Sequence, residues 1–333
     1  MPRPRLPLVA ALLAATALIA GCGGPPEAEP AAGSPTAGDG AGFPVVVPHA
    51  FGETTIPAKP QRVVALGLND VAVAQTVGAP LVGAIRNVTG EPNLPYLEPL
   101  PEDVVGLQLD PVVGLEQVAA YRPDMILAVS YPQLEQSIYD DLTAIAPVVT
   151  FEKSLYGSSM QDDARQIGRA LGEQDAVEGL IADAEQRIAE VREELPGLQG
   201  ATYLYGQARG DVLPLVVGDD NLSTVFMNSL GLQVPGSFRD APASDALAPG
   251  TVGLSYEEAS RLDDADLLFM TFAADGDRSR FEGNELVQRL SIVREDRYRP
   301  VDLDEAVALQ APSVVSTGWL IDRIRPALEQ AAG

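Results

Sequence analysis

Short runs of apolar residues alternate with helical patterns from residue 62 onward. A strand that is buried on both faces is apolar throughout, whereas an amphipathic helix repeats its apolar residues every three or four positions. The alternation therefore indicates an α/β fold with a mainly parallel sheet. The predicted strands are residues 62–66, 80–85, 124–129 and 147–151, and the predicted helices between them are residues 70–77, 114–120 and 133–144.

The same alternation begins again near residue 201 and predicts a second lobe, with strands at residues 201–205, 266–272 and 298–303. The segment between the lobes is strongly helical, because one apolar stripe recurs at spacings of four and three residues. That stripe consists of Leu180, Ala184, Ile188, Val191 and Leu195, and Pro196 and Gly197 end the helix. We therefore expect an N-terminal lobe at residues 43–157, a connecting helical segment at 158–197 and a C-terminal lobe at 198–333.

The first 42 residues have a different pattern. Two arginines precede an apolar run at residues 6–20, which is too short to span a bilayer and matches a secretory signal. The Ile-Ala-Gly-Cys at residues 19–22 is similar to the lipobox of bacterial lipoproteins. We expect a signal peptide at residues 1–21, a palmitate-type lipid anchor on Cys22 and a flexible tether at 22–42. The protein would then be extracytoplasmic and anchored to the cell membrane.

Composition narrows the classes of function. The chain has 47 acidic and 22 basic residues and a formal charge of −25, which argues against nucleic-acid binding. Its one cysteine, Cys22, and its one histidine, His49, exclude an internal disulfide, a cysteine zinc site and a three-histidine metal site. No phosphate-binding G-x-x-x-x-G-K-[ST] motif occurs, and no spacing singles out a catalytic carboxylate pair. We expect a protein that is not an enzyme, with no cofactor and no metal site of its own.

Four stretches resemble known motifs of one family. Residues 59–64 (K-P-Q-R-V-V) lead into 70–83 (D-V-A-V-A-Q-T-V-G-A-P-L-V-G), and residues 114–126 read G-L-E-Q-V-A-A-Y-R-P-D-M-I. Residues 141–149 read D-L-T-A-I-A-P-V-V, and residues 254–258 read L-S-Y-E-E. In order and spacing these resemble the siderophore and cobalamin class of periplasmic-type solute-binding proteins of ABC importers. The resemblance implies two Rossmann-like lobes, a single long backbone helix joining them, a ligand cleft between the lobes and no catalysis.

Ligands of open α/β sheets bind beyond the carboxyl ends of the strands, so residues that follow predicted strands are ligand-binding candidates. In the first lobe they are Asn69, Arg86 and Tyr131, and in the second they are Tyr205, Arg209, Met270, Phe272, Arg278 and Arg280. The planar guanidinium group of arginine can bind two oxygens of a carboxylate, hydroxamate or catecholate at once. Any single arginine of this set could equally be an ordinary solvated surface residue. Trp319 is a further stacking candidate. Helix packing explains Trp319 equally well, and the tyrosines could simply complete the core.

The leading ligand is a ferric siderophore, with cobalamin or haem as alternatives, and a surface or signalling lipoprotein that does not transport is the alternative function. Ser255 and Glu258 fit a capping box, which leaves Glu257 facing solvent, and Glu116 also points outward near a helix start. The resemblance implies that one such glutamate on each lobe docks on arginines of the importer permease subunits. Ordinary first-turn helix acids are the alternative reading. We expect the protein to be a monomer.

Overall fold

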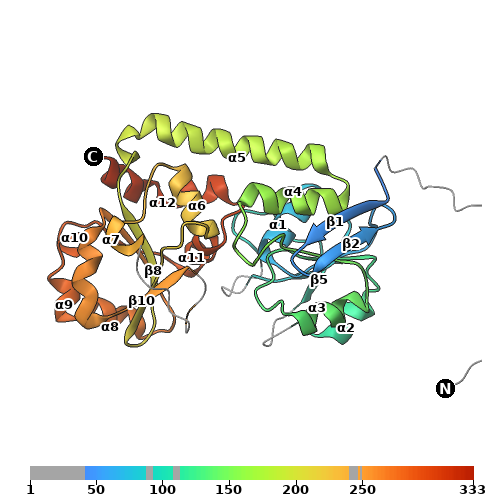
Figure 1. The fold of residues 1–333 in the computed structure, drawn as a ribbon, viewed down its shortest axis with the longest axis horizontal. Coiled ribbons are helices and arrows are strands. Elements are labelled where there is room, and N and C mark those ends of the chain that lie inside the picture. Colours follow the sequence, from blue (N-terminus) through green and yellow to red (C-terminus); the bar gives the residue numbers. More distant parts are fainter. Residues whose placement is uncertain (1–41, 88–92, 108–112, 240–246, 248–249) are drawn as a thin grey trace, which may run out of the picture. The chain divides into compact units, whose positions relative to one another are not determined.

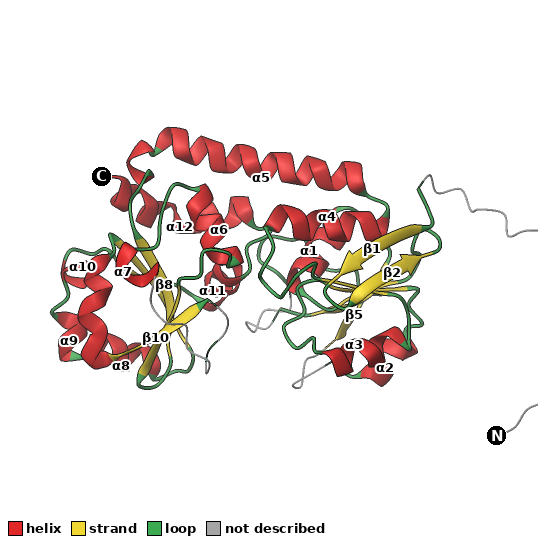
Figure 2. Cartoon of the chain, viewed as in Figure 1, coloured by secondary structure: helices red, strands yellow, loops and turns green. Residues whose placement is uncertain are grey.

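The computed structural model describes residues 42–87, 93–107, 113–239, 247 and 250–333 (Figure 1). The predicted signal peptide, the lipidation site Cys22 and the tether up to residue 41 lie outside these residues. A short antiparallel hairpin of β1 (Val45–His49) and β2 (Gly52–Ile56) comes first. Two five-stranded sheets follow, and each is flanked by helices (Figure 2).

The first sheet is parallel throughout and has the strand order β5-β4-β3-β6-β7. Its strands are β3 (Val63–Ala65), β4 (Leu81–Ile85), β5 (Val105–Leu107), β6 (Met125–Ala128) and β7 (Val148–Thr150). The helices are α1 (Leu68–Thr76), α2 (Leu115–Ala120) and α3 (Gln136–Thr143). The four strands and three helices predicted from the sequence are confirmed. The three-residue β5 was not predicted.

This sheet is buried on both faces, as its apolar runs predicted. In β6, Met125 and Leu127 belong to one core cluster, whereas Ile126 and Ala128 belong to the other. Successive side chains of a strand point to opposite faces, so the two clusters cover the two sides of the sheet. A strand between two apolar layers has no solvent-facing side, and this explains why its sequence does not alternate.

The second sheet is mixed and has the order β10-β9-β8-β11-β12. Its strands are β8 (Tyr203–Ala208), β9 (Val212–Val216), β10 (Thr251–Ser255), β11 (Leu267–Phe272) and β12 (Tyr298–Pro300). The three predicted strands are parallel, whereas β9 and β10 are antiparallel additions that were not predicted. The β8–β9 turn contains Gly210 with a φ of 57°. Glycine reaches this left-handed region without strain, so the turn fits a tight hairpin.

Helices fill the rest of the second lobe. They are α6 (Leu222–Ser229), α7 (Gly236–Arg239), the 3₁₀ helix η2 (Tyr256–Asp264), α8 (Asp277–Gly283), α9 (Glu285–Gln288), α10 (Ser291–Arg294), α11 (Leu303–Gln310) and α12 (Thr317–Ala332). The apolar stripe of α12 is buried, with Leu320, Ile324 and Leu328 at 0% exposure. None of the helices in the described part of the chain combines the length and apolarity that a membrane crossing needs.

The connecting segment consists of two helices, α4 (Met160–Leu171) and α5 (Gln174–Glu194), followed by the short 3₁₀ helix η1 (Pro196–Leu198). Gly172 ends α4 in the left-handed conformation, with a φ of 71°. The buried face of α5 is Val177, Ile181, Ala184, Ile188 and Val191. The middle of the predicted stripe is confirmed, whereas Leu180 and Leu195 at its two ends are only partly buried. The 21-residue α5 contacts α4 along its N-terminal half and α12 along its C-terminal half, and it thereby joins the two lobes.

Candidate ligand-binding cleft

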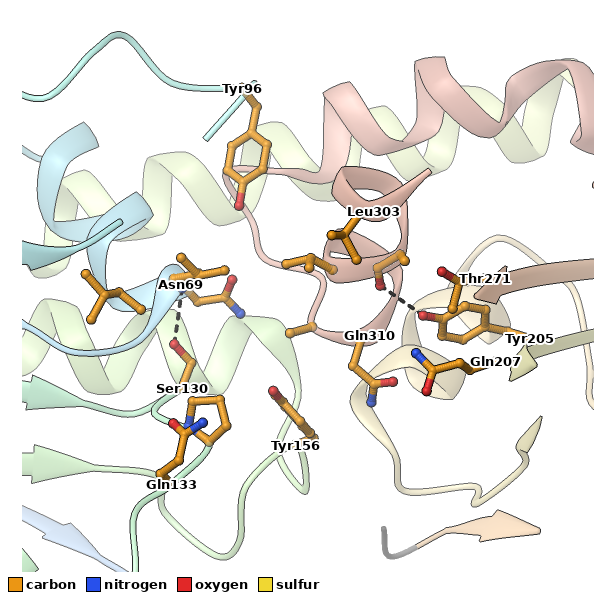
Figure 3. A pocket seen from close by; sticks show the side chains of 16 residues that line it. Asn69, Tyr96, Ser130, Gln133, Tyr156, Tyr205, Gln207, Thr271, Leu303 and Gln310 are labelled. Atoms are coloured by element: carbon orange, nitrogen blue, oxygen red, sulfur yellow. Dashed lines mark hydrogen bonds between the residues drawn. The ribbon is translucent and has the colours of Figure 1, made fainter. Parts of the chain in front are cut away.

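A cavity of about 340 Å³ opens at the carboxyl ends of strands from both sheets (Figure 3). Its polar lining from the first lobe and the connection to α4 comprises Asn69, Tyr96, Ser130, Gln133 and Tyr156. Its polar lining from the second lobe comprises Tyr205, Gln207, Thr271 and Gln310. The two groups face each other across the cavity in Figure 3. The cavity therefore lies where open α/β sheets bind their ligands.

The first-lobe wall is held by one buried carboxylate, Asp70, at the start of α1. The backbone N–H of Val129 donates to its Oδ1 at 3.0 Å, and the backbone N–H of Ser130 donates to its Oδ2 at 3.3 Å. The Ser130 hydroxyl in turn accepts the backbone N–H of Asn69 at 3.1 Å. These bonds tie the turn after β6 to the turn after β3, and both turns line the cavity.

Gly67 makes this arrangement possible. A Cβ atom at this position would lie 2.0 Å from the Ser130 Oγ and 2.3 Å from the Asp70 Oδ2. Any other residue would force the two turns apart, because real side-chain atoms do not approach so closely. The glycine after β3 is thus required by the close approach of the backbone to the buried carboxylate.

Two carboxyl groups behind this wall have raised pKa values. Burial raises the pKa of Asp70 to about 7, although the N–H donors of Ser130, Val129 and Gly67 oppose the shift. Burial, together with the negative charges of Asp70, Asp162 and Glu152, raises the pKa of Asp163 on α4 to about 8. Asp70, which holds the first-lobe wall, and Asp163 on α4 therefore change their protonation near neutral pH.

The second-lobe wall is built from side chains on regular elements. The Tyr205 hydroxyl, on β8, donates to the Ala306 carbonyl of α11 at 2.9 Å (Figure 3). Glu305 is 2% exposed. It accepts from Arg299 at 2.5 Å and from Arg323 at 3.0 Å. This network and the Asp302–Glu305 capping box fix α11, whose residues line the cavity.

The two lobes also touch beside the cavity. Tyr96 of the first lobe packs against Trp319 of α12, with ring centroids 5.7 Å apart. The Asn87 amide donates to the Asp304 carboxylate of α11 at 3.0 Å. Burial, and then the charge of Asp304, raises the pKa of Tyr96. The Tyr96 phenol therefore stays protonated and available as a hydrogen-bond donor.

A second cavity of about 350 Å³ adjoins the first. The two share the lining residues Tyr156, Tyr205, Gln207, Thr271 and Gln310. The second adds Arg209, whose Nη2 donates to the Gln207 Oε1 at 2.8 Å. Tyr156 lies between β7 and α4 with a φ of 59°, which is uncommon for a residue other than glycine. The shared residues make the two cavities parts of one cleft.

The structure brings three of the ten predicted ligand contacts to this cleft, namely Asn69, Tyr205 and Arg209. Tyr131 is fully buried and its hydroxyl accepts the Val113 N–H at 3.1 Å, so it completes the first-lobe core. Met270 is fully buried as well. Phe272 packs against Phe281 with ring centroids 6.3 Å apart. These aromatic and apolar side chains at strand ends therefore pack in the hydrophobic core. Core packing was the alternative that the sequence left open for the tyrosines.

The remaining candidates line neither cavity in the described part of the chain. Arg86 donates to the Val104 carbonyl at 3.2 Å and lies against Gly106. Arg278 pairs with Glu282 at 2.9 Å, and Arg280 pairs with Asp211 at 2.9 Å. Trp319 packs against Tyr96, which lines the cleft. Their role as ligand contacts stays a prediction.

The glutamates predicted to dock on a permease are both exposed. Glu258 accepts the Ser255 N–H at 3.1 Å, and this bond lowers the pKa of Glu258. The capping box is therefore confirmed, and Glu257 is left outside it. Glu116 lies in the first turn of α2. No group of three or more His, Cys, Asp or Glu side chains suited to a metal gathers in the described residues.

Sequence reasoning missed several lining residues, namely Tyr96, Gln133, Tyr156, Gln207 and Gln310. A signal for two of them was present. Gln207 lies two residues after Tyr205 in β8 and therefore shares its face. Gln133 lies in the same loop as Tyr131, but the sequence prediction chose the tyrosine as the ligand contact from this loop. Tyr96 and Gln310 follow no predicted strand directly, so the strand-end rule could not select them.

Comparisons with known proteins agree with this architecture. A family model described as a periplasmic binding protein matches residues 63–299. The probable siderophore-binding lipoprotein YfiY of Bacillus subtilis is 27% identical over 295 residues, which cover 84% of this chain and 86% of that protein. The solved structure of a periplasmic solute-binding protein from Mycobacterium smegmatis has a TM-score of 0.72 and 28% sequence identity. The match covers 87% of this chain and 99% of the Mycobacterium smegmatis chain.

The solved complex of Streptococcus pneumoniae PiaA with ferrichrome has a TM-score of 0.69 at 22% identity, and covers 86% of this chain and 98% of its own. This likeness concerns the fold alone. The two-lobed α/β architecture that the sequence motifs implied is confirmed. Because the family match runs from the first strand of one sheet into the last strand of the other, the chain belongs to the periplasmic binding protein family.

Proposed function

We propose that this protein binds a ferric siderophore in the cleft and delivers it to the permease of an ABC importer. The observation that carries the proposal is the cavity of about 340 Å³ lined by polar side chains at the strand ends of both lobes. A cleft of this kind suits capture of a small, oxygen-rich ligand. The name of YfiY, a probable siderophore-binding lipoprotein, supports the same ligand class.

We further propose that the protein works outside the cytoplasmic membrane, held there by lipid on Cys22. The apolar run and the Ile-Ala-Gly-Cys at residues 19–22 support this anchor. YfiY is likewise named a lipoprotein. Cys22→Ser should move the protein from the membrane fraction to the soluble fraction, since two acyl chains supply the membrane affinity. Retention of the variant in the membrane fraction would reject this anchor.

Docking on the permease is proposed to use Glu116 and Glu257, one on each lobe. Both side chains are exposed, and neither belongs to the cleft lining. Two separate charge contacts act bivalently, so Glu116→Ala/Glu257→Ala should nearly abolish uptake and leave ligand affinity unchanged. Asp141→Ala/Asp275→Ala is the matched control, because it removes one exposed carboxylate from each lobe. Equal uptake by the two double variants would reject these docking residues.

The function itself is tested by uptake of radioactive iron, supplied as siderophore complexes, in cells that lack the gene. Restoring the gene should restore uptake of at least one complex. Gln310→Trp should not restore it, because the larger side chain would fill the cavity that Gln310 lines. Gln330→Trp on the surface of α12 is the control and should behave as wild type. Equal uptake with and without the gene, for every complex supplied, would refute the proposal.

A further inference from the structure

The polar groups that line the cleft are mostly uncharged. Four side-chain carboxamides line the cleft. Asn69 and Gln133 belong to the first lobe, and Gln207 and Gln310 belong to the second. Hydroxyl groups of serine, threonine and tyrosine supply the rest of the polar lining. Such groups donate and accept hydrogen bonds, but they do not neutralise a charged ligand.

Positive charge is scarce at this place. Arg209 is the one cation among the described residues that line either cavity, and it is exposed and bonded to the Gln207 side chain. Arg278 and Arg280, in the neighbouring helix α8, are each paired with a carboxylate. The four internal segments outside the described residues contain no lysine or arginine in their sequence, so they add no cation wherever they lie.

Carboxyl groups, in contrast, lie close behind the lining. The Asp70 carboxylate contacts Ser130, and the Asp304 carboxylate influences the Tyr96 phenol. An anionic ligand would meet the charge of Asp304, and that of Asp70 where this group is ionised, with one exposed arginine to offset its desolvation. Burying unpaired charge is strongly unfavourable, and the penalty grows with the number of charges.

One lining group is poised for a neutral, hydrogen-bonding ligand. The Gln133 Oε1 is buried and has no hydrogen-bond partner in the described part of the chain. A buried acceptor without a partner is costly, and a ligand N–H or hydroxyl would remove that cost. The Tyr96 and Tyr156 phenols, whose pKa values burial raises, can donate to ligand carbonyl or N–O oxygens.

We infer that the cleft selects ferric chelates with little or no net negative charge. This inference rests on the proposed siderophore-binding function. Trihydroxamates are that class, since three hydroxamate anions balance the charge of Fe³⁺. Three catecholate dianions leave a net charge of −3 on the complex, which this lining does not balance. The carboxamides and phenols would hold the chelate through its neutral rim of oxygen and amide groups.

The sole tryptophan offers a direct readout, because Trp319 packs against Tyr96 of the cavity lining. Quenching of its fluorescence is titrated with ferrichrome, a neutral trihydroxamate, and with ferric enterobactin, a tris-catecholate, with calorimetry as a second readout. At low ionic strength the Kd for ferrichrome should be at least about 100-fold lower than the Kd for ferric enterobactin. A difference of this size corresponds to burying one or two uncompensated charges of the catecholate complex. Equal or tighter binding of ferric enterobactin would overturn the inference while leaving the proposed function intact. Binding of neither chelate by either readout would overturn the inference, whereas the proposed function fails only if uptake is independent of the gene for every complex supplied.

A charge-adding variant tests the cause of the selectivity. Gln310→Arg places a guanidinium in the cleft and should lower the ferric enterobactin Kd by about tenfold, with a smaller effect on ferrichrome. Gln330→Arg adds the same charge on the exposed face of α12 and should change neither Kd. An equal response of the two variants to ferric enterobactin would contradict selection by charge within the cleft.

Discussion

The two walls of the cleft are held in different ways. The first-lobe wall consists of backbone turns after β3 and β6, and both turns bond to the single carboxylate of Asp70, which is fully buried. The second-lobe wall consists of side chains on β8, β11 and α11, and several partly exposed groups support it. The comparison teaches that each wall depends on one buried carboxylate: Asp70 bonds to uncharged backbone N–H groups, whereas Glu305 pairs with two guanidinium groups that solvent reaches.

Removing the buried carboxylate should have the largest effect. Asp70→Ala would leave the Val129 and Ser130 N–H groups buried without partners. Each such group costs about 1–3 kcal/mol, so the free energy of unfolding should fall by about 3 kcal/mol, and ligand affinity should fall with it. Urea unfolding measures the change, with the exposed Asp141→Ala as control. A loss below about 1 kcal/mol would mean that Asp70 is not what holds this wall.

The matching change in the second lobe should cost less. Glu305→Ala removes the partner of Arg299 and Arg323, whose side chains are 24% and 48% exposed. Because water can solvate both guanidinium groups, we expect a loss of about 2 kcal/mol, below the range for a fully buried pair. Glu285→Ala, which breaks the exposed pair with Arg289, is the control. A loss larger than that of Asp70→Ala would reverse the comparison of the two walls.

The first-lobe wall should also give stability an unusual dependence on pH. An unfolded aspartate ionises near pH 3.8, whereas burial raises the pKa of Asp163 to about 8 and that of Asp70 to about 7. Between these values the unfolded state loses its proton before the folded state does. The contribution to stability therefore falls as pH rises from about 4 to about 7 for Asp70 and from about 4 to about 8 for Asp163. The slope is at most about 1.4 kcal/mol per pH unit for each group.

Asp163→Asn isolates this effect, because the amide does not titrate. Urea unfolding at a series of pH values should show a smaller loss of stability between pH values of about 5 and 8 for the variant than for the wild type. Identical slopes for the two proteins would show that Asp163 does not contribute.

The fold could be predicted where the sequence pattern follows from burial alone. The strands of the first sheet are apolar on both faces, and each predicted run coincides with a strand. The antiparallel strands β9 and β10 were not predicted. A prediction from βα units expects a helix after each strand, whereas β8 is followed directly by the antiparallel strand β9. The three-residue β5 is too short to form a pattern of its own.

The site was predicted less well, and the reason is chemical. The strand-end rule located the cleft and selected Asn69, Tyr205 and Arg209. Several other arginine and aromatic side chains at strand ends, predicted as ligand contacts, instead pair with carboxylates or complete the core. Gln310 comes from a helix, and the structural role of Asp70 depends on contacts about 60 residues away in the sequence. Neither can be read from local spacing.

The central claim is that a ferric chelate binds between these two walls. Crystals grown with ferrichrome and measured at the iron absorption edge test it directly, because the anomalous signal locates the metal without any assumption about the ligand. The account predicts one iron peak inside the cleft, between the Asn69 side of the first lobe and the Gln310 side of the second. An iron peak elsewhere on the protein, or a cleft that stays empty when calorimetry has shown ferrichrome to bind, would contradict it.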